Sequence, residues 1–486
     1  MSKITIKINL PGGIVSTGDL QSILRGAESA GASSISFGNR QQLYFEIDED
    51  QLEDLEHHFF VSDTVYEVNA NNHPNMISSY VSEDIFDSTG WLREGVYKDI
   101  LDSFSFTPTL KINLVDSSQT FIPFFTGNIN FISSEVSNYW YMYVRFPKTN
   151  QIYCWSSLIY SEDISEMSKR IESAILESPA LRHGVNAADD HFLEENVSPL
   201  SGSIRQLPSS ALKLPSFQIP CYEGFNRYGD KYWLGIYRRN EHFSIGFLKD
   251  VCAMCVQTRI GQLYTTPWRS LLIKGITAAD HEQWKFLILK HGIRTRHATS
   301  ELNWQIEDLC EPGLHLKLAL AKAFDEEDLS TGDLCFAIKM NPKAGLFGSV
   351  ILKRTHVLDG TEERFDILHT ADFNPNSKNT VCYRKDVTTA ALAEVLAELC
   401  LYYQDQIVSA IHHNHIEPVS GADIDTLDTV FQCTFCLSVY DEKTGDEPGG
   451  VAPGTLFEAL PETFRCPLCE AEKSAFTEME RHKMYT

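Results

Sequence analysis

Two Cys-x-x-Cys pairs near the end of the chain constrain its fold more than any other feature. Cys433 and Cys436 form the first pair, Cys466 and Cys469 form the second, and an acidic, turn-rich stretch separates them. Four cysteines at this spacing can surround one metal ion tetrahedrally, as in a zinc ribbon or a mononuclear iron centre. The spacing alone does not choose the metal. It predicts a small domain that folds around its metal, because so short a segment cannot hold itself together.

The remainder of the chain has the composition of an ordinary globular protein. With 486 residues, of which 43% are hydrophobic and 22% charged, we expect several domains. No long apolar run and no secretory signal are visible, so we expect a cytoplasmic protein with no membrane partner. In that compartment paired cysteines predict metal binding rather than disulfides. The net charge of −25 and the absence of a basic stripe argue against a nucleic-acid partner.

The residues around the two cysteine pairs identify the small domain more closely. The segment "CTFCLSVYDEKTGDEPGGVAPGTLFEALPETFRCPLCEAEKSAF" resembles rubredoxin without a gap, within a domain that we place at about residues 429–480. The matching positions are Cys433, Cys436, Tyr440, Asp441, Gly445, Asp446, Val451, Pro453, Gly454, Thr455, Phe457, Leu460, Pro461, Cys466, Pro467, Leu468, Cys469, Lys473 and Phe476. The resemblance implies that the four cysteines bind one iron ion, which carries single electrons.

The rest of this segment fits that implication, with one departure. An apolar shell around the metal lowers solvent access and tunes its potential, and here it would consist of Tyr440, Phe457, Leu460, Phe464 and Phe476. Rubredoxins usually have glycine after the second cysteine of each pair, where this chain has Leu437 and Glu470. A non-glycine residue in a left-handed conformation costs about 1–2 kcal/mol. Metal binding supplies on the order of 10 kcal/mol, so the site should tolerate the strain. Structural zinc stays the alternative.

The large body contains a repeated β-α-β-β-α pattern. In the first copy "KITIKINLP" alternates as a strand, Ser16 and Asp19 form a capping box before a helix, and "SSISFGNRQQLYFEI" predicts two further strands. A similar order recurs from "KYWLGIYRR" through "QLYTTPWRSLLIKGI", with Arg40 near Trp268 and Gln41 near Arg269. We interpret this as an internal duplication of a ferredoxin-like unit.

The expected architecture is therefore α+β, with duplicated ferredoxin-like half-domains, mixed α/β domains and a small iron-binding domain. Each half-domain copy is followed by a mixed α/β stretch, and Ser/Pro-rich passages are read as linkers. The predicted segments are 1–70 (first half-domain), 71–195 (mixed α/β), 196–222 (linker), 223–300 (second half-domain), 301–416 (mixed α/β), 417–428 (linker) and 429–480 (metal-binding).

Two turns in the repeated units resemble those of siroheme-dependent nitrite and sulfite reductases. "GNRQQLYF" and "TTPWRSLLI" look like the two turns that lie beside siroheme in that family, and "HPNMISSYV" resembles the segment that follows the first unit. The resemblance covers roughly residues 1–415. It implies that Arg40, Gln41, Trp268 and Arg269 are cofactor-binding residues. Arginine suits this role because it binds carboxylates through two parallel hydrogen bonds, and siroheme carries eight carboxylates.

The catalytic cysteines of that family are missing from this sequence. The reductases bind a four-iron cluster through C-x5-C and C-x3-C, and no cysteine pair in this chain has either spacing. We therefore expect no [4Fe–4S] cluster, and siroheme itself is doubtful. The simpler expectation for Arg40 and Arg269 is that these long charged side chains remain at the surface, at strand ends.

Three functions remain open from the sequence. The favoured one is a rubredoxin-type one-electron carrier that serves assimilatory nitrite or sulfite reduction, in which the body is a non-catalytic docking platform. Its expected partners are a reductase and an electron donor, because the metal segment has eight acidic residues and three basic ones and so suits a basic redox protein. The second is a reductase whose body binds siroheme or another cofactor and receives electrons from its own iron. The third is an interaction protein with structural zinc.

Overall fold

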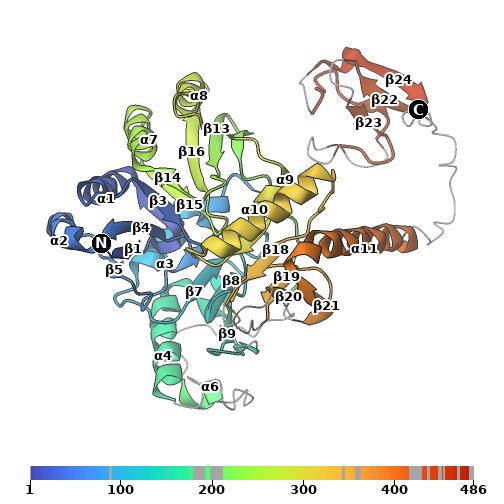
Figure 1. Cartoon of the computed structure of the whole chain (residues 1–486). Helices are drawn as coiled ribbons and strands as arrows, with labels where there is room; N and C mark the ends of the chain where they lie inside the picture. Colours follow the sequence, from blue (N-terminus) through green and yellow to red (C-terminus); the bar gives the residue numbers. More distant parts are fainter. Residues whose placement is uncertain are drawn as a thin grey trace. The chain divides into compact units, whose positions relative to one another are not determined.

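The computed structural model divides the chain into two compact units, residues 1–407 and 408–486, which we describe separately. It describes residues 2–86, 90–149, 151–178, 192–197, 212–341, 345–355, 363–377, 379–414, 429–434, 438–446, 451, 455–467 and 471–480. Among these residues, those of the first unit, the large body, form four sheets, and those of the second form a small sheet of their own (Figure 1).

The first ferredoxin-like copy is an antiparallel sheet with two helices. Its elements are β1 (Lys3–Ile8), β2 (Ile14–Ser16), α1 (Thr17–Ser29), β3 (Ser34–Phe37), β4 (Leu43–Asp48), α2 (Leu52–Val61) and β5 (Glu67–Val68). The sheet order is β14-β3-β4-β1-β5, in which β14 (Phe243–Ser244) comes from the second copy. Apolar side chains alternate inward along β1 and β4, as a sheet with one covered face requires.

The second copy repeats this arrangement. Its other elements are β12 (Gly224–Tyr228), β13 (Lys231–Ile236), α7 (Ile245–Gln257), β15 (Gln262–Thr265), β16 (Leu271–Thr277) and α8 (His281–Lys290). The sheet order is β12-β13-β16-β15-β2, so each copy gives one short strand to the sheet of the other. The exchange joins the copies through β2–β15 and β14–β3 pairing, which confirms the predicted duplication and makes the two sheets interdependent.

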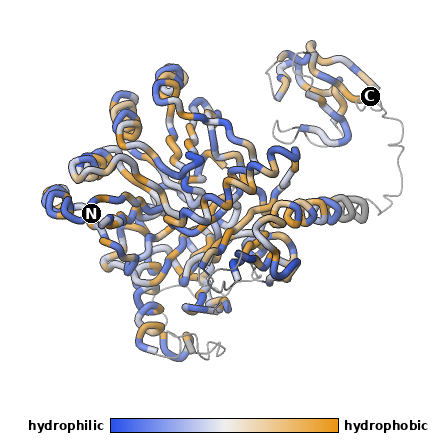
Figure 2. Tube along the Cα trace, in the orientation of Figure 1, coloured by the Kyte–Doolittle hydropathy of each residue, from blue (hydrophilic) through white to orange (hydrophobic). Residues whose placement is uncertain are grey.

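Local sequence explains why both copies begin their first helix at the same place. Ser16 caps α1 by accepting a hydrogen bond from the amide of Asp19, and Ser244 caps α7 by accepting one from the amide of Phe247. A serine at this position satisfies an amide that would otherwise lack a partner at the start of a helix. Helices α1 and α7 carry both hydrophobic and hydrophilic residues, as amphipathic helices do (Figure 2). Their buried faces contribute to a core shared by both sheets.

The mixed α/β stretches also form an equivalent pair. The first contains β6 (Ile77–Ser78), α3 (Glu94–Asp102), β7 (Ile112–Val115), β8 (Ile129–Ser133), β9 (Tyr139–Arg145), β10 (Ile152–Cys154), β11 (Ile159–Tyr160), α4 (Ile164–Glu177) and α6 (Phe192–Asn196). The second contains α9 (Thr299–Leu302), β17 (Trp304–Ile306), α10 (Glu311–Glu326), β18 (Phe336–Lys339), β19 (Val350–Arg354), β20 (Arg364–Thr370), β21 (Thr380–Thr388) and α11 (Leu392–Asn414).

Both of these sheets share a path of two parallel strand pairs followed by two antiparallel ones, and in the first sheet β11 also pairs with β9 in antiparallel fashion. Strands β6-β7-β8 run parallel and β8-β9-β10 antiparallel, and strands β17-β18-β19 and β19-β20-β21 repeat the same directions. Among the described residues the duplication therefore extends to the mixed α/β stretches as well as the ferredoxin-like parts. The predicted domain boundaries stay a prediction. In the predicted linker at 196–222, residues 198–211 lie outside the described residues. The apolar side chains that follow them pack against the body's core, namely Leu212, Leu214, Phe217 and Ile219.

The small domain is a three-stranded antiparallel sheet with an aromatic core. Its strands are β22 (Thr429–Cys433), β23 (Val439–Tyr440) and β24 (Phe476–Glu480), in the order β23-β22-β24. The predicted linker at 417–428 lies outside the described residues. Across the described part of the whole chain, no helix is long and apolar enough to cross a membrane.

Candidate metal centre and the paired turns of the body

The small domain places two of the four predicted metal ligands in its core. Cys433 ends β22 and Cys466 follows the isolated bridge between Arg465 and Glu472; both cysteines are buried, with exposures of 0% and 1%. Cys436 and Cys469 lie outside the described residues. Among the described residues no three His, Cys, Asp or Glu side chains form a metal cluster, and half of the predicted set is not among them.

The two Cys-x-x-Cys turns have the same backbone geometry where the structure describes them. The amide of Cys433 donates a hydrogen bond to the carbonyl of Ser438 at 2.8 Å, and the amide of Cys466 donates one to Ala471 at 2.9 Å. Each first cysteine is thus bonded to the residue five positions later. Because the two turns are equivalent, their thiols can be presented to one metal in an equivalent way.

The predicted apolar shell is present around these cysteines. Tyr440, Phe457, Leu460, Phe464 and Phe476 are all buried and form one cluster with Cys433 and Cys466. The tyrosine is fixed by its hydroxyl, which donates to the carbonyl of Thr455 at 2.8 Å. A set of buried thiols in a dry aromatic shell fits a metal that prefers thiolate ligands.

Two polar contacts near the cysteines were not anticipated from the sequence. Ser438 places its Oγ 3.0 Å from Sγ of Cys466, so one turn contacts the cysteine of the other. Lys473 donates to the carbonyl of Leu460 at 2.7 Å and lies over the ring of Phe457. The position of Ser438, five residues after Cys433, is a local feature of the first turn that the sequence shows. Its contact with Cys466 depends on the fold, because it joins the two turns across the domain.

The two turns of the body also share one backbone geometry. In the first, Gly38 and Gln42 are joined by an amide-to-carbonyl bond of 2.8 Å; in the second, Thr266 and Ser270 are joined by one of 3.1 Å. Gln41 and Arg269 occupy the same position and have positive φ values of 63° and 54°. This conformation is unusual for residues other than glycine and is held here by the tertiary structure. The expected alignment of Gln41 with Arg269 therefore matches the observed turns.

Arg40 and Arg269 are buried, and the expectation that they remain at the surface was wrong. Their exposures are 7% and 3%. Arg40 donates to the carbonyl of Asn75 at 2.7 Å and to the carbonyl of Ile112 at 3.0 Å. Burial lowers the pKa of Arg40 to about 9, and Arg145 adds to the effect. Arg40 can be buried because these two carbonyls accept the hydrogen bonds that its guanidinium would otherwise donate to water.

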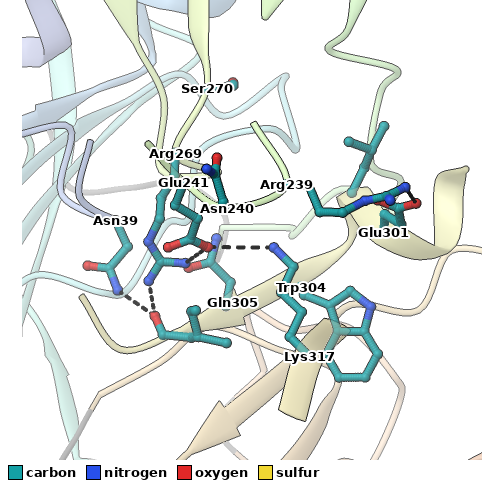
Figure 3. A network of polar contacts seen from close by, with 12 residues as sticks. Asn39, Arg239, Asn240, Glu241, Arg269, Ser270, Glu301, Trp304, Gln305 and Lys317 are labelled. Carbon is teal, nitrogen blue, oxygen red and sulfur yellow. Dashed lines mark hydrogen bonds and ion pairs between the residues drawn. The ribbon is translucent and has the colours of Figure 1, made fainter. Parts of the chain in front are cut away.

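Arg269 is the centre of a charged network (Figure 3). Its guanidinium lies 3.2 Å from Glu241 and 3.3 Å from Asp308, and it also donates to the carbonyl of Ile306. Lys317 approaches the same carboxylate of Glu241 at 3.6 Å. Burial lowers the pKa of Arg269, but the two carboxylates outweigh burial and raise the pKa above its usual value.

Asp308 connects this network to the first turn. Its carboxylate accepts hydrogen bonds from the amide of Asn39 at 2.9 Å and from Nε2 of Gln42 at 3.0 Å. Burial raises the pKa of this carboxyl group, and Arg269 opposes the shift. Sequence reasoning did not find Asp308 because it follows β17, far along the chain from both turns and in no motif.

Gln41 and Trp268 are held by the chain in a similar way. Nε2 of Gln41 donates to the carbonyl of Thr265 at 2.9 Å and its Oε1 accepts from the amide of Ser78 at 2.9 Å. Nε1 of Trp268 donates to the carbonyl of Phe121 at 2.9 Å. All four residues predicted to bind a cofactor are thus buried and bonded to the protein itself.

The space between the two turns is small. The cavity lined by Asn39, Arg40, Pro267 and Asp308 has a volume of about 100 Å³. Pockets that enclose drug-sized ligands have roughly 300–1,000 Å³, and siroheme is a larger molecule. This cavity adjoins a larger one of about 750 Å³, with which it shares the lining residues Lys111, Gly345 and Leu346.

Comparison with known proteins assigns the small domain and the fold of the body. The rubredoxin family model matches residues 430–476. The high molecular weight rubredoxin of Moorella thermoacetica is 51% identical over 49 residues, which are 10% of this chain and 21% of that protein. Rubredoxin-2 of Chlorobaculum tepidum is 41% identical over 49 residues, which are 10% of this chain and 94% of that protein. This chain thus spans about a fifth of the Moorella protein and nearly all of the Chlorobaculum one.

The body is similar to a solved structure over most of its length. The structure of the Mycobacterium tuberculosis NirA protein matches with a TM-score of 0.60 and 13% sequence identity, covering 81% of this chain and 80% of that chain. At this identity the match shows the fold alone. The chain therefore belongs to the rubredoxin family through its C-terminal domain, which is fused to a body with the NirA fold.

Proposed function

We propose that this protein is a one-electron carrier for nitrite or sulfite reduction, with the body as a non-catalytic docking platform. The observation that carries the proposal is a contrast within one chain. The small domain keeps the four cysteines of a rubredoxin, whereas the body bonds its candidate cofactor residues internally. The NirA fold of the body supports the choice of pathway.

Cys433, Cys436, Cys466 and Cys469 would hold the iron. Iron bound by four thiolates supplies a one-electron couple between its ferric and ferrous forms. The chain's own residues exclude water through the aromatic shell and keep the turns in place through the bonds to Ser438 and Ala471. Fixed partners of this kind orient the ligands and tune the metal.

Acidic side chains at the surface of the small domain favour a basic redox partner. Glu458 and Glu478 are exposed, and so are Glu462 and Glu472, which pair at the surface with Lys473 at 3.6 Å and Arg465 at 2.9 Å. Electrostatic complementarity of this kind accelerates association more than it raises affinity. The encounter with a reductase or donor should therefore weaken strongly as ionic strength rises.

Three measurements on the purified full-length chain test this proposal together. Total iron, acid-labile sulfide and the visible spectrum should show about one iron per chain, no sulfide and bands of a ferric thiolate centre that disappear reversibly on reduction. Five or more irons with sulfide, or siroheme bands, would replace the carrier with a catalytic reductase. A colourless protein with stoichiometric zinc would replace it with the structural-zinc alternative.

A further inference from the structure

The helices of the two ferredoxin-like copies form one layer. Helix α1 packs against α2 on one side and against α7 on the other, and α7 packs against α8. Lys249 of α7 pairs with Glu28 of α1 at 2.7 Å, and Lys290 of α8 pairs with Asp250 of α7 at 2.6 Å. The order α2-α1-α7-α8 puts α2 and α8 at opposite ends of the layer (Figure 1).

Matching backbone hydrogen bonds show which residues of the two copies are equivalent. Helices α2 and α8 end with the same amide-to-carbonyl bonds, namely Ser62–His58, Asp63–Phe60 and Thr64–Phe59 in the first copy, and His291–Leu287, Gly292–Leu289 and Ile293–Ile288 in the second. The ends of α1 and α7 match in the same way, through Gly31–Glu28 and Arg259–Val256. The two ends of the layer can therefore be compared residue by residue.

The α8 end of the layer has an exposed apolar patch. Phe286 and Leu289 of α8 are 67% and 77% exposed, and Val256 of the adjacent α7 is 68% exposed. The buried face of α8 consists of other residues, namely Trp284, Leu287 and Ile288. The first copy has the polar residues Glu28 and His57 at the positions of Val256 and Phe286. The fold therefore does not require apolar side chains there, and exposed apolar patches mark contact surfaces.

The α2 end of the layer has an apolar patch of its own. Phe60 and Val61 end α2 and Val65 follows it, with exposures of 87%, 74% and 81%. In the second copy the positions of Val61 and Val65 carry the basic residues Lys290 and Arg294. The α2 patch (Phe60, Val61 and Val65) and the α8 patch (Val256, Phe286 and Leu289) are thus built mostly from different positions of the repeated unit.

The two patches lie in surroundings of different charge. Counting Lys, Arg, Asp and Glu, helices α1 and α2 contain one basic and five acidic residues, whereas α7 and α8 contain three basic and two acidic ones. Glu56 of α2 and Lys285 of α8 occupy equivalent positions beside the patches, have opposite charges and are both exposed. An apolar contact with complementary charges at its rim is the usual anatomy of a specific interface.

We propose that copies of this chain associate head to tail, with the α2 patch of one body against the α8 patch of the next. A second copy supplies both an apolar patch and the complementary charge. A contact between two α8 patches would instead bring Lys285 and Lys290 of both copies together. A head-to-tail contact leaves one patch free at each end, so it builds a closed ring or a longer row of copies. This inference concerns the body alone and does not rest on the electron-carrier function.

Sedimentation velocity of the full-length chain over a range of concentrations tests the association. The average mass should rise with concentration, and the association should weaken with salt because charges flank the contact. Phe60→Glu and Phe286→Glu place a charge in the α2 patch and the α8 patch, and each should weaken association at least about tenfold. Leu401→Glu is the matched control on α11, where the side chain is 55% exposed and outside both patches. It should leave association within about twofold.

Mixing the two patch variants separates this arrangement from the others. Each variant keeps the patch that the other has lost, so an equimolar mixture of Phe60→Glu and Phe286→Glu should form a dimer that neither forms alone. The dimer also shows that both variants are folded. A mixture that stays monomeric, a loss of association in only one variant, or an unmodified protein that is monomeric at every concentration would overturn the proposal. An equal loss in Leu401→Glu would show non-specific association and contradict it as well.

Discussion

The cysteine turns of the small domain and the turns at 38–42 and 266–270 of the body are both repeated pairs with matching backbone hydrogen bonds. In the small domain the two turns present chemically identical groups, the buried thiols of Cys433 and Cys466. In the body the equivalent positions carry Gln41 and Arg269, which differ in charge and bond to different partners. A repeated backbone can therefore carry different chemistry in its two copies. We expect the two regions to respond very differently when their central residues are replaced.

Loss of a metal ligand should have the largest effect. If Cys466 is a ligand as proposed, replacing it with alanine removes a thiolate from the metal centre, and structural metal sites contribute about 10 kcal/mol to folding. The variant should purify with almost no iron and no visible absorbance. Iron content per chain is the measurement.

The matched control is Cys382→Ala, which removes an exposed cysteine of β21 in the body. It should retain the iron content of the unmodified protein. If Cys466→Ala kept a stoichiometric iron and its reversible reduction, Cys466 would not be a ligand.

Replacing Arg269 with alanine should destabilise the body by about 3–5 kcal/mol, because the carboxylates of Glu241 and Asp308 lose their main buried partner. Arg239→Ala is the control: it breaks a pair with Glu301 in which the arginine is 50% exposed, so it should cost about 0–1 kcal/mol. Urea unfolding followed by tryptophan fluorescence measures both. A similar loss of unfolding free energy in both variants would show that the buried network stabilises the body no more than an exposed ion pair does.

The sequence was a sound guide to these features only where a pattern is local. The cysteine spacing, the capping box at Ser16 and the strand-turn-strand order of both copies each extend over a few residues. The family match supports the first, and the structure agrees with the other two. The exchange of β2 and β14 could not be predicted, because strands of three and two residues leave no periodicity. The partners of Arg40 and Arg269 are main-chain carbonyls and distant side chains such as Asp308, which no spacing reveals. The burial of both arginines was missed for that reason.

Lys111 offers a smaller, pH-dependent test of the body. Its pKa is lowered to about 8 in the folded state from 10.5, mainly by burial. Between these values the unfolded state binds more protons than the folded state, so stability should rise with pH through this window. Below about pH 8 Lys111 is charged in both states, so the folded protein bears the full free-energy cost of burying its charge. Lys111→Met should therefore be more stable than the unmodified protein at pH 7, and the difference should shrink by pH 10. The measurement is the urea midpoint of both proteins from pH 7 to 10. A difference between their midpoints that did not change with pH would contradict the lowered pKa of Lys111.

The smallest expected effect returns to the cysteine turns. Ser438 Oγ lies 3.0 Å from Sγ of Cys466, and once that cysteine is a thiolate only the serine can donate the hydrogen bond. A donor to sulfur stabilises the more negative, reduced state, so Ser438→Ala should lower the midpoint potential, on the order of tens of millivolts. Thr434→Ala is the control, because that hydroxyl donates to the carbonyl of Ala475 instead. Spectroscopic redox titration of both variants decides the point: a shift in Thr434→Ala equal to that in Ser438→Ala would trace the change to the fold of the turns rather than to the sulfur contact.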